Sequence, residues 1–199
     1  MAVLYLQLPL PHYWVLRFHI QSIAVKASRI LGFLFRACSY FSSKDLLQLY
    51  KAQVRPLMEY CSNIWSAAPD SCLSILDKIQ ARAIRLIDDA VLTARLQALA
   101  HRRAVASLCL LYRYYYKDCS LELTGCIPPP VVLAANRTSR SVASSHPFAL
   151  ASIPSRTNAC GRSFFPRTIK LWNSLPFSAF PEEFNLQSFK CNINRLTLH

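Results

Sequence analysis

The chain has 199 residues, 23 Lys and Arg against 10 Asp and Glu, and three glycines. The length allows one domain, or one domain with an appendage. Gly32, Gly125 and Gly161 lie too far apart to build a glycine-rich phosphate loop, which excludes the common nucleotide-binding motifs of that type. The formal charge of +13 favours a polyanionic partner, most often nucleic acid.

The eight cysteines form no C-x-x-C pair, and the five histidines complete no zinc-finger spacing. We therefore expect reduced thiols, an intracellular location, and no metal or other cofactor. The first 16 residues are uncharged but lack the basic start and small-residue cleavage site of a signal peptide. No run reaches the roughly 20 apolar residues of a membrane span, so we expect no membrane partner.

In chain order, residues 1–19 show no period and are predicted to be an irregular N-terminal remnant. Residues 20–125 are predicted to form a helical domain. Its first helix runs from Ile20 to Cys38, with apolar residues at i, i+3 and i+4 spacing. Lys26, Arg29 and Arg36 fall on the opposite side of that helix.

Ser42, with Asp45 three residues later, is a capping-box arrangement and predicts the start of the second helix. Its apolar stripe is predicted to comprise Leu46, Tyr50, Val54, Leu57, Met58, Cys61, Ile64 and Trp65. Pro56 lies within this pattern and lacks a backbone N–H, so we expect a kink or break near residues 53–55.

A third helix is predicted over residues 71–87, with Lys78, Arg82 and Arg85 on its outer face. A shorter helix is expected over 93–99, followed by a long helix over 101–117. Arg102 and Arg113 lie eleven residues apart in the long helix, about three turns, so they share a face with Lys117 nearby.

The composition changes after Cys126. Three consecutive prolines, Pro128 to Pro130, end regular structure, and residues 126–163 are predicted to be an extended Pro/Ser/Arg-rich basic linker. No acidic residue stands between Leu123 and Pro181. Two short helices, over 165–175 and 186–196, are expected in the C-terminal segment 164–199. The fold class is therefore mainly α.

Asp88 and Asp89 are adjacent carboxylates, which invites a metal-dependent phosphoryl-transfer reading. The pair ends a predicted helix, however, and no strand flanks it. We interpret it as a helix-terminal pair or the start of the next cap. No nucleophile–base set emerges, and the sequence predicts no catalytic residue.

Three predicted helices carry Lys and Arg away from their apolar stripes. Such faces can neutralise phosphates and release counterions, although a solvated surface is the alternative for any single face. The sequence predicts backbone contacts to RNA or DNA, without sequence preference, from six cations: Lys78, Arg82, Arg85, Arg102, Arg103 and Arg113.

Five blocks in fixed order carry a family resemblance: residues 26–34 (KASRILGFL), 49–65 (LYKAQVRPLMEYCSNIW), 79–87 (IQARAIRLI), 95–103 (RLQALAHRR) and 167–176 (RTIKLWNSLP), followed by Phe189-Lys190. Together they resemble the C-terminal region, beyond the palm, of the reverse transcriptase of jockey-like non-LTR (LINE-type) retrotransposons. The similarity covers about residues 14–199.

The resemblance implies a helical, thumb-like module that rides on a primer–template duplex and would pack on a polymerase palm in the parent protein. The chain has no counterpart of the palm or of its metal-binding aspartates. We therefore expect a non-catalytic fragment of an RNA-directed DNA polymerase. Two alternatives stay open: a helical protein-interaction module, and a non-functional orphan fragment.

Overall fold

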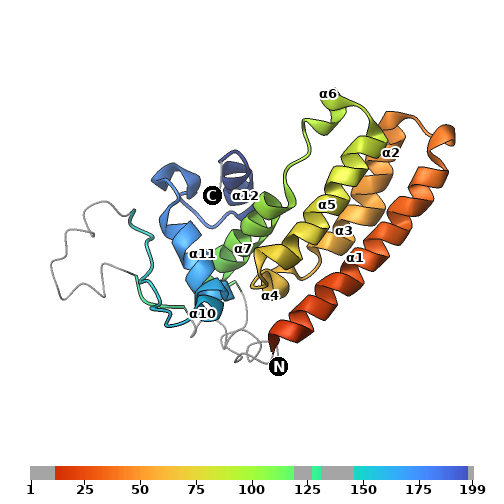
Figure 1. Ribbon diagram of the computed structural model, residues 1–199. Coiled ribbons are helices and arrows are strands. Elements are labelled where there is room, and N and C mark those ends of the chain that lie inside the picture. Colours follow the sequence, from red (N-terminus) through yellow and green to blue (C-terminus); the bar gives the residue numbers. More distant parts are fainter. Residues whose placement is uncertain (1–11, 119–126, 131–145, 197–199) are drawn as a thin grey trace. The chain divides into compact units, whose positions relative to one another are not determined.

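The computed structural model describes residues 12–118, 127–130 and 146–196. They are mainly helical, as the sequence predicts, and within them the only β-type pairing is an isolated bridge between Pro130 and Leu150 (Figure 1). The chain divides into an N-terminal unit, Pro9–Arg103, and a C-terminal unit that contains Ala104–His199. This division falls inside a helix that the sequence places wholly in one domain, because each half of that helix packs into a different core.

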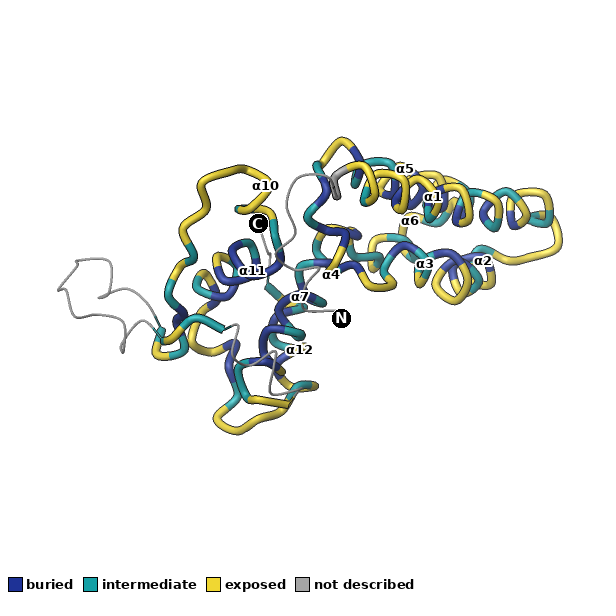
Figure 2. The backbone as a smooth tube through the Cα atoms, turned by 90° about the horizontal axis from the view of Figure 1, so that it is seen from below, coloured by how far each residue is buried: buried dark blue, intermediate teal, exposed yellow. Residues whose placement is uncertain are grey.

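Helix α1 spans His12–Arg36 and begins earlier than the expected start at Ile20. Residues 12–19, expected to be irregular, are its first turns, because Leu16 continues the apolar stripe by one turn and packs on the same core. Ile20, Ala24, Ala27, Leu31 and Leu34 are its buried residues, and they pack against α5 (Asp70–Ile87) and α3 (Arg55–Glu59). Figure 2 shows buried and exposed residues alternating along α1 and α5.

Helix α2 (Ser43–Leu49) and α3 are joined by a π-helical turn over Tyr50–Val54. The predicted capping box is confirmed: the Ser42 hydroxyl accepts from the Asp45 amide, and the Asp45 carboxylate accepts from the Ser42 amide. The predicted break before Pro56 takes the form of the π turn, in which the Arg55 amide donates to the Tyr50 carbonyl. Pro56 cannot donate, so the wider turn relieves the clash that an α-helix would impose.

Two residues expected on the buried stripe, Cys61 and Ile64, are exposed. Cys61 has φ 51°, in the left-handed region, and this turns the chain before the short helix α4 (Ser62–Trp65). The helical spacing that the sequence suggests is therefore interrupted. Trp65 still reaches the core, where its indole N–H donates to the Tyr60 carbonyl at 2.9 Å.

Asp88 and Asp89 are helix-end residues. Asp88 closes α5 in the left-handed conformation with φ 49°, and the Asp89 carboxylate accepts from the Leu92 amide as N-cap of α6 (Ala90–Thr93). Because this cap starts α6 early, the helix expected over 93–99 does not form: residues 94–98 are non-helical.

Helix α7 (Leu99–Tyr115) contributes its first residues to the N-terminal unit and the remainder to the C-terminal unit. In the latter it packs with α11 (Phe164–Asn173) and α12 (Leu186–Asn194), close to the two expected C-terminal helices. Trp172, fully buried, lies at the centre of an aromatic cluster with Tyr112, Phe180 and Phe189. The ring centroids of Tyr112 and Phe189 are 4.2 Å apart and stacked.

Residue 126 and residues 131–145 of the expected linker lie outside the described residues. Its described part is not wholly extended, because Thr157 caps a short helix, α10 (Asn158–Arg162), that the sequence does not predict. A second small helical piece, Phe177–Ala179, precedes α12, and a third, Cys38–Tyr40, follows α1. Among the described residues, no helix combines the length and apolar character that crossing a membrane requires.

Candidate nucleic-acid interface

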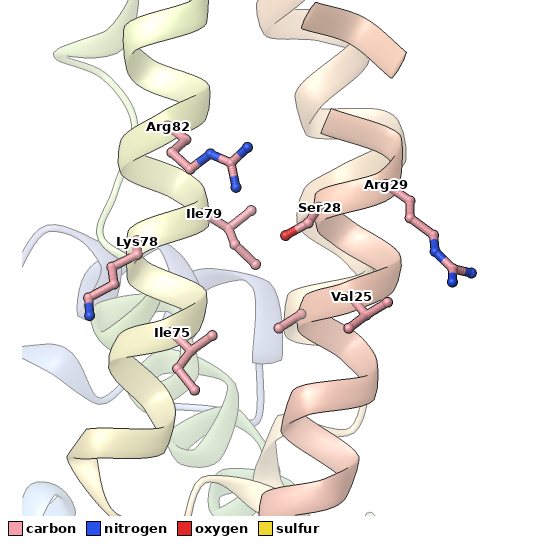
Figure 3. Close-up of a pocket in the computed structure, with 8 residues that line it drawn as sticks. Val25, Ser28, Arg29, Ile75, Lys78, Ile79 and Arg82 are labelled. Atoms are coloured by element: carbon pink, nitrogen blue, oxygen red, sulfur yellow. The ribbon is translucent and has the colours of Figure 1, made fainter. Parts of the chain in front are cut away.

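An open groove of about 560 Å³ runs between α1 and α5 of the N-terminal unit. Its floor is apolar, and its rim carries the three cations Arg29, Lys78 and Arg82. Figure 3 shows the Arg82 side chain directed across the groove towards α1, where the Ser28 hydroxyl faces it, while Arg29 points outward from α1 and Lys78 outward from α5. Arg82 therefore places its positive charge over the apolar strip, whereas Arg29 and Lys78 stand at its two outer edges.

Three of the six predicted contact residues lie together on α5. Lys78, Arg82 and Arg85 are exposed and are spaced by four and three residues, so they form one stripe about 10 Å long. Among the described residues, no acid lies within ion-pair distance of any of them. The sequence predicts that these three residues lie on the outer face of the helix, and their exposure confirms that placement. Their charges are accessible to solvent.

Four of the six acids of the N-terminal unit are engaged in ion pairs or helix caps. Glu59 pairs with Arg102 and lies 3.6 Å from Arg55, and Asp77 pairs with Arg103. Asp45 and Asp89 cap helices, and hydrogen bonds from Ser42 hold the pKa of Asp45 below its usual value. Helix α1 contains no acidic residue at all. Among the described residues, none of these acids forms an ion pair with Arg29, Lys78 or Arg82.

Arg102 and Arg103 have structural roles. Arg102 donates from Nε and Nη2 to the two carboxylate oxygens of Glu59, and this pairing raises the pKa of its guanidinium. Arg103 is buried, which lowers the pKa of its guanidinium, and its Nη2 lies 3.6 Å from an Asp77 oxygen that partly offsets the burial. Both guanidinium groups are therefore engaged by acids of their own unit.

Arg113 belongs to the C-terminal unit, and nothing places it with the α5 cations. Its Nε donates to the Asp118 carboxylate at 2.9 Å. This contact accompanies the end of α7, where Lys117 has φ 58° and the Asp118 amide donates back to the Arg113 carbonyl. The side chain and the carbonyl of Arg113 thus both bind Asp118 at the C-terminal end of α7.

Arg29 is the groove cation that the list of predicted contacts lacks. The sequence places it on the outer face of the first helix but gives no sign that it also lines the edge of a groove with α5. One signal was available: Ala24 and Ser28 are small residues four positions apart, and small side chains let a neighbouring helix approach closely. Both line the groove.

Within the described ranges, no three His, Cys, Asp or Glu side chains gather as a metal site. The described cysteines are free thiols. Burial raises the pKa of the Cys109 thiol to about 11, which suppresses its thiolate at neutral pH.

Comparisons with protein-family models, with curated proteins and with solved structures find no match for this chain. The retrotransposon resemblance therefore rests on the sequence blocks alone.

Proposed function

We propose that this chain is a retrotransposon-derived fragment of an RNA-directed DNA polymerase, without the palm, that binds the nucleic-acid backbone. The observation that carries the proposal is the α1–α5 groove, with Arg29, Lys78 and Arg82 on its rim and Arg85 one turn further along α5. Binding is sequence-independent, because these cations meet phosphates rather than base edges.

Charge segregation supports this role. Residues Pro9–Arg103 contain thirteen Lys and Arg against six Asp and Glu, and four of those acids are held in ion pairs or helix caps. Acids that are held in ion pairs or helix caps do not neutralise the other cations, so the surface around those cations has a positive electrostatic potential. Such a field attracts a polyanion over about a Debye length of 10 Å at 0.1 M salt.

The blocks that carry the resemblance contact one another in the N-terminal unit, which supports the family assignment. Tyr50 donates to Gln80 at 3.1 Å, joining the block at 49–65 to the block at 79–87. Glu59 accepts from Arg102, joining the first of these blocks to the block at 95–103. Motif residues of a shared fold are expected to meet in this way.

The proposed module is non-catalytic. Asp88 and Asp89, the one adjacent carboxylate pair that invites a metal, serve as helix caps, and the fragment contains no counterpart of the family's palm aspartates. A thumb-like module needs only to hold a duplex by its backbone, which the α5 stripe can do.

The test is a salt titration of the full chain with a 20-bp RNA–DNA duplex, followed by fluorescence anisotropy. The triple variant Lys78→Gln/Arg82→Gln/Arg85→Gln should bind at least about tenfold more weakly at ~50 mM salt. Its log K against log salt slope should fall by about 2–3, because each lost phosphate contact removes nearly one unit.

The matched control is Lys44→Gln/Lys51→Gln/Arg95→Gln, which removes the same charge from exposed positions of the same unit away from the groove. If both triple variants lost the same affinity, the effect would come from the net charge of the chain and not from the groove. An unmodified chain that fails to bind at ~50 mM salt, or binds without salt dependence, would overturn the proposal.

A second candidate is a helical protein-interaction module, favoured by the large apolar residues exposed on α1, among them Trp14, Phe18 and Phe33. Gel filtration with and without the duplex separates the two. Self-association or a salt-insensitive complex with protein favours this candidate, whereas a shift only with nucleic acid favours the first.

A further inference from the structure

Helix α1 carries a second face, directly opposite its buried stripe. Helical spacing puts Phe18, Val25, Arg29, Phe33 and Arg36 on this side, which lies half a turn from Ala27 and Leu31. All five are exposed. Trp14 lies one turn before Phe18, and we call these six residues the outer stripe of α1. In Figure 3, Arg29 points away from α5, as this geometry requires.

The outer stripe is unusual in its apolar content. Trp14, Phe18 and Phe33 are 58%, 67% and 61% exposed, and all three are aromatic. The corresponding outer face of α5 carries Lys78, Arg82 and Arg85 instead. Solvent exposure of several large aromatic side chains on one helix marks a contact surface.

The cations of the outer stripe restrict what can cover it. Arg29 and Arg36 interleave with the aromatic residues, and no acid stands anywhere on α1. A second copy of the same stripe would bring these arginines against like charges, which disfavours self-pairing. A lipid-binding helix instead separates an apolar face from a basic one, and the outer stripe mixes the two.

A stripe that combines aromatic and cationic side chains fits one ligand chemistry well. Unpaired bases stack on aromatic rings while neighbouring phosphates meet arginines, and this combination binds single strands with little sequence preference. Phe18 and Phe33 lie fifteen residues apart, about 22 Å along the helix, which accommodates several nucleotides.

We propose that the outer stripe of α1 binds a single-stranded segment of RNA or DNA by base stacking on Trp14, Phe18 and Phe33. This inference rests on the proposed function, because the α5 cations next to α1 would hold the backbone of the same molecule. The N-terminal unit would then bind a nucleic acid that has a single-stranded part more tightly than a fully paired duplex.

The chain carries its own optical reporter for this contact. Of its three tryptophans, Trp65 and Trp172 are 1% and 0% exposed, whereas Trp14 is 58% exposed. Titration with an unlabelled 20-nucleotide oligo(U) should therefore quench a fraction of the tryptophan emission, and Trp14→Phe should abolish that quenching. A blunt 20-bp RNA–DNA duplex should produce little quenching.

Affinity measurements on the full chain separate stacking from charge. Phe18→Leu/Phe33→Leu keeps apolar side chains but removes the rings, and it should weaken oligo(U) binding at least about tenfold while leaving duplex binding and the salt slope unchanged. Tyr40→Leu, which removes an exposed ring off the stripe, is the matched control and should have no effect. Circular dichroism verifies that each variant is folded.

The outcomes distinguish the two proposals. If Phe18→Leu/Phe33→Leu leaves oligo(U) binding intact, or if oligo(U) does not quench Trp14, base stacking is overturned while duplex binding through α5 can still stand. If neither nucleic acid binds, both proposals fail. Quenching of Trp14 by vesicles of anionic phospholipid, and not by oligo(U), would assign the stripe to a membrane surface instead.

Discussion

Arg102 and Glu59 are joined by two parallel hydrogen bonds, from Nε to Oε1 and from Nη2 to Oε2, the second 2.9 Å long. The pair fastens the first turn of α7 to the last turn of α3, 43 residues earlier in the chain. Both side chains are about three-quarters buried. Arg102, which the sequence predicts to contact nucleic acid, thus links α7 to α3 within the N-terminal unit.

Arg102→Gln should therefore destabilise the chain without weakening nucleic-acid binding. We expect a loss of about 1–3 kcal/mol in the free energy of unfolding, because Glu59 would keep its charge and lose its bidentate partner. Urea unfolding followed by circular dichroism measures the change. Arg95→Gln, at an exposed cation of the same unit, should change stability by less than about 0.5 kcal/mol.

Tyr50→Phe tests the buried hydrogen-bond chain of the N-terminal unit. The Tyr50 hydroxyl donates to Gln80 Oε1, and Gln80 Nε2 donates to the Gln97 carbonyl, both at 3.1 Å. Removing the hydroxyl leaves a buried acceptor unpaired, which should cost about 1–3 kcal/mol. Tyr40→Phe, at a ring that is 86% exposed, serves as control, and equal stability losses in both variants would contradict this role.

Cys61→Gly should stabilise the chain. Cys61 is exposed and has φ 51°, a conformation that costs an L-residue with a side chain about 1 kcal/mol and costs glycine almost nothing. The melting temperature should rise by a few degrees. Cys191→Gly, inside α12 at an exposed helical position, should lower it, because glycine is unfavourable there.

The C-terminal unit should weaken at alkaline pH. Burial raises the pKa of the Cys109 thiol from about 9 to about 11, so the folded state holds a proton that the unfolded state releases first. The stabilisation is complete below pH 9 and is lost as the pH rises through about 11. Melting temperatures recorded between pH 8 and pH 11 should fall, and Cys109→Ala should make that fall shallower. An identical pH profile in the variant would exclude Cys109 as a cause.

Asn173→Ala should release the segment at residues 146–151. The Asn173 amide accepts from the Leu150 N–H at 3.0 Å and donates to the Leu150 carbonyl at 2.8 Å. Losing both bonds should cost about 1–2 kcal/mol. Hydrogen exchange at the Leu150 amide should accelerate at least tenfold. Ser174→Ala, at the neighbouring exposed residue, should leave that exchange rate unchanged.

Local chemistry made part of the fold predictable. Ser42 and Asp45 specify a helix start by their own hydrogen bonds, and Pro56 specifies a break by its missing N–H, so neither needs a distant partner. The third helix was predicted within one residue, at 71–87 against Asp70–Ile87, because its apolar residues repeat regularly. Its basic outer face follows from the same periodicity.

Tertiary contacts decided the rest. Arg102 meets Glu59 only because α7 folds back on α3, which no spacing reveals. Arg103 was open to prediction: it lies four residues after Leu99 and four before Ser107, both buried, so it stands on the inner stripe of α7. The Trp172-Asn173 pair also has a physical basis, since Trp172 fills the aromatic core and the Asn173 side chain hydrogen-bonds to both backbone groups of Leu150.

The contact between Asn173 and Leu150 also bears on how the chain behaves in concentrated solution. An extended segment with open amide and carbonyl groups invites strand addition from another molecule. At Leu150 both groups are occupied by one side-chain amide, and the next amide, at Ala151, donates to the Pro129 carbonyl. Asn173 thus closes a backbone edge that would otherwise be open to intermolecular aggregation.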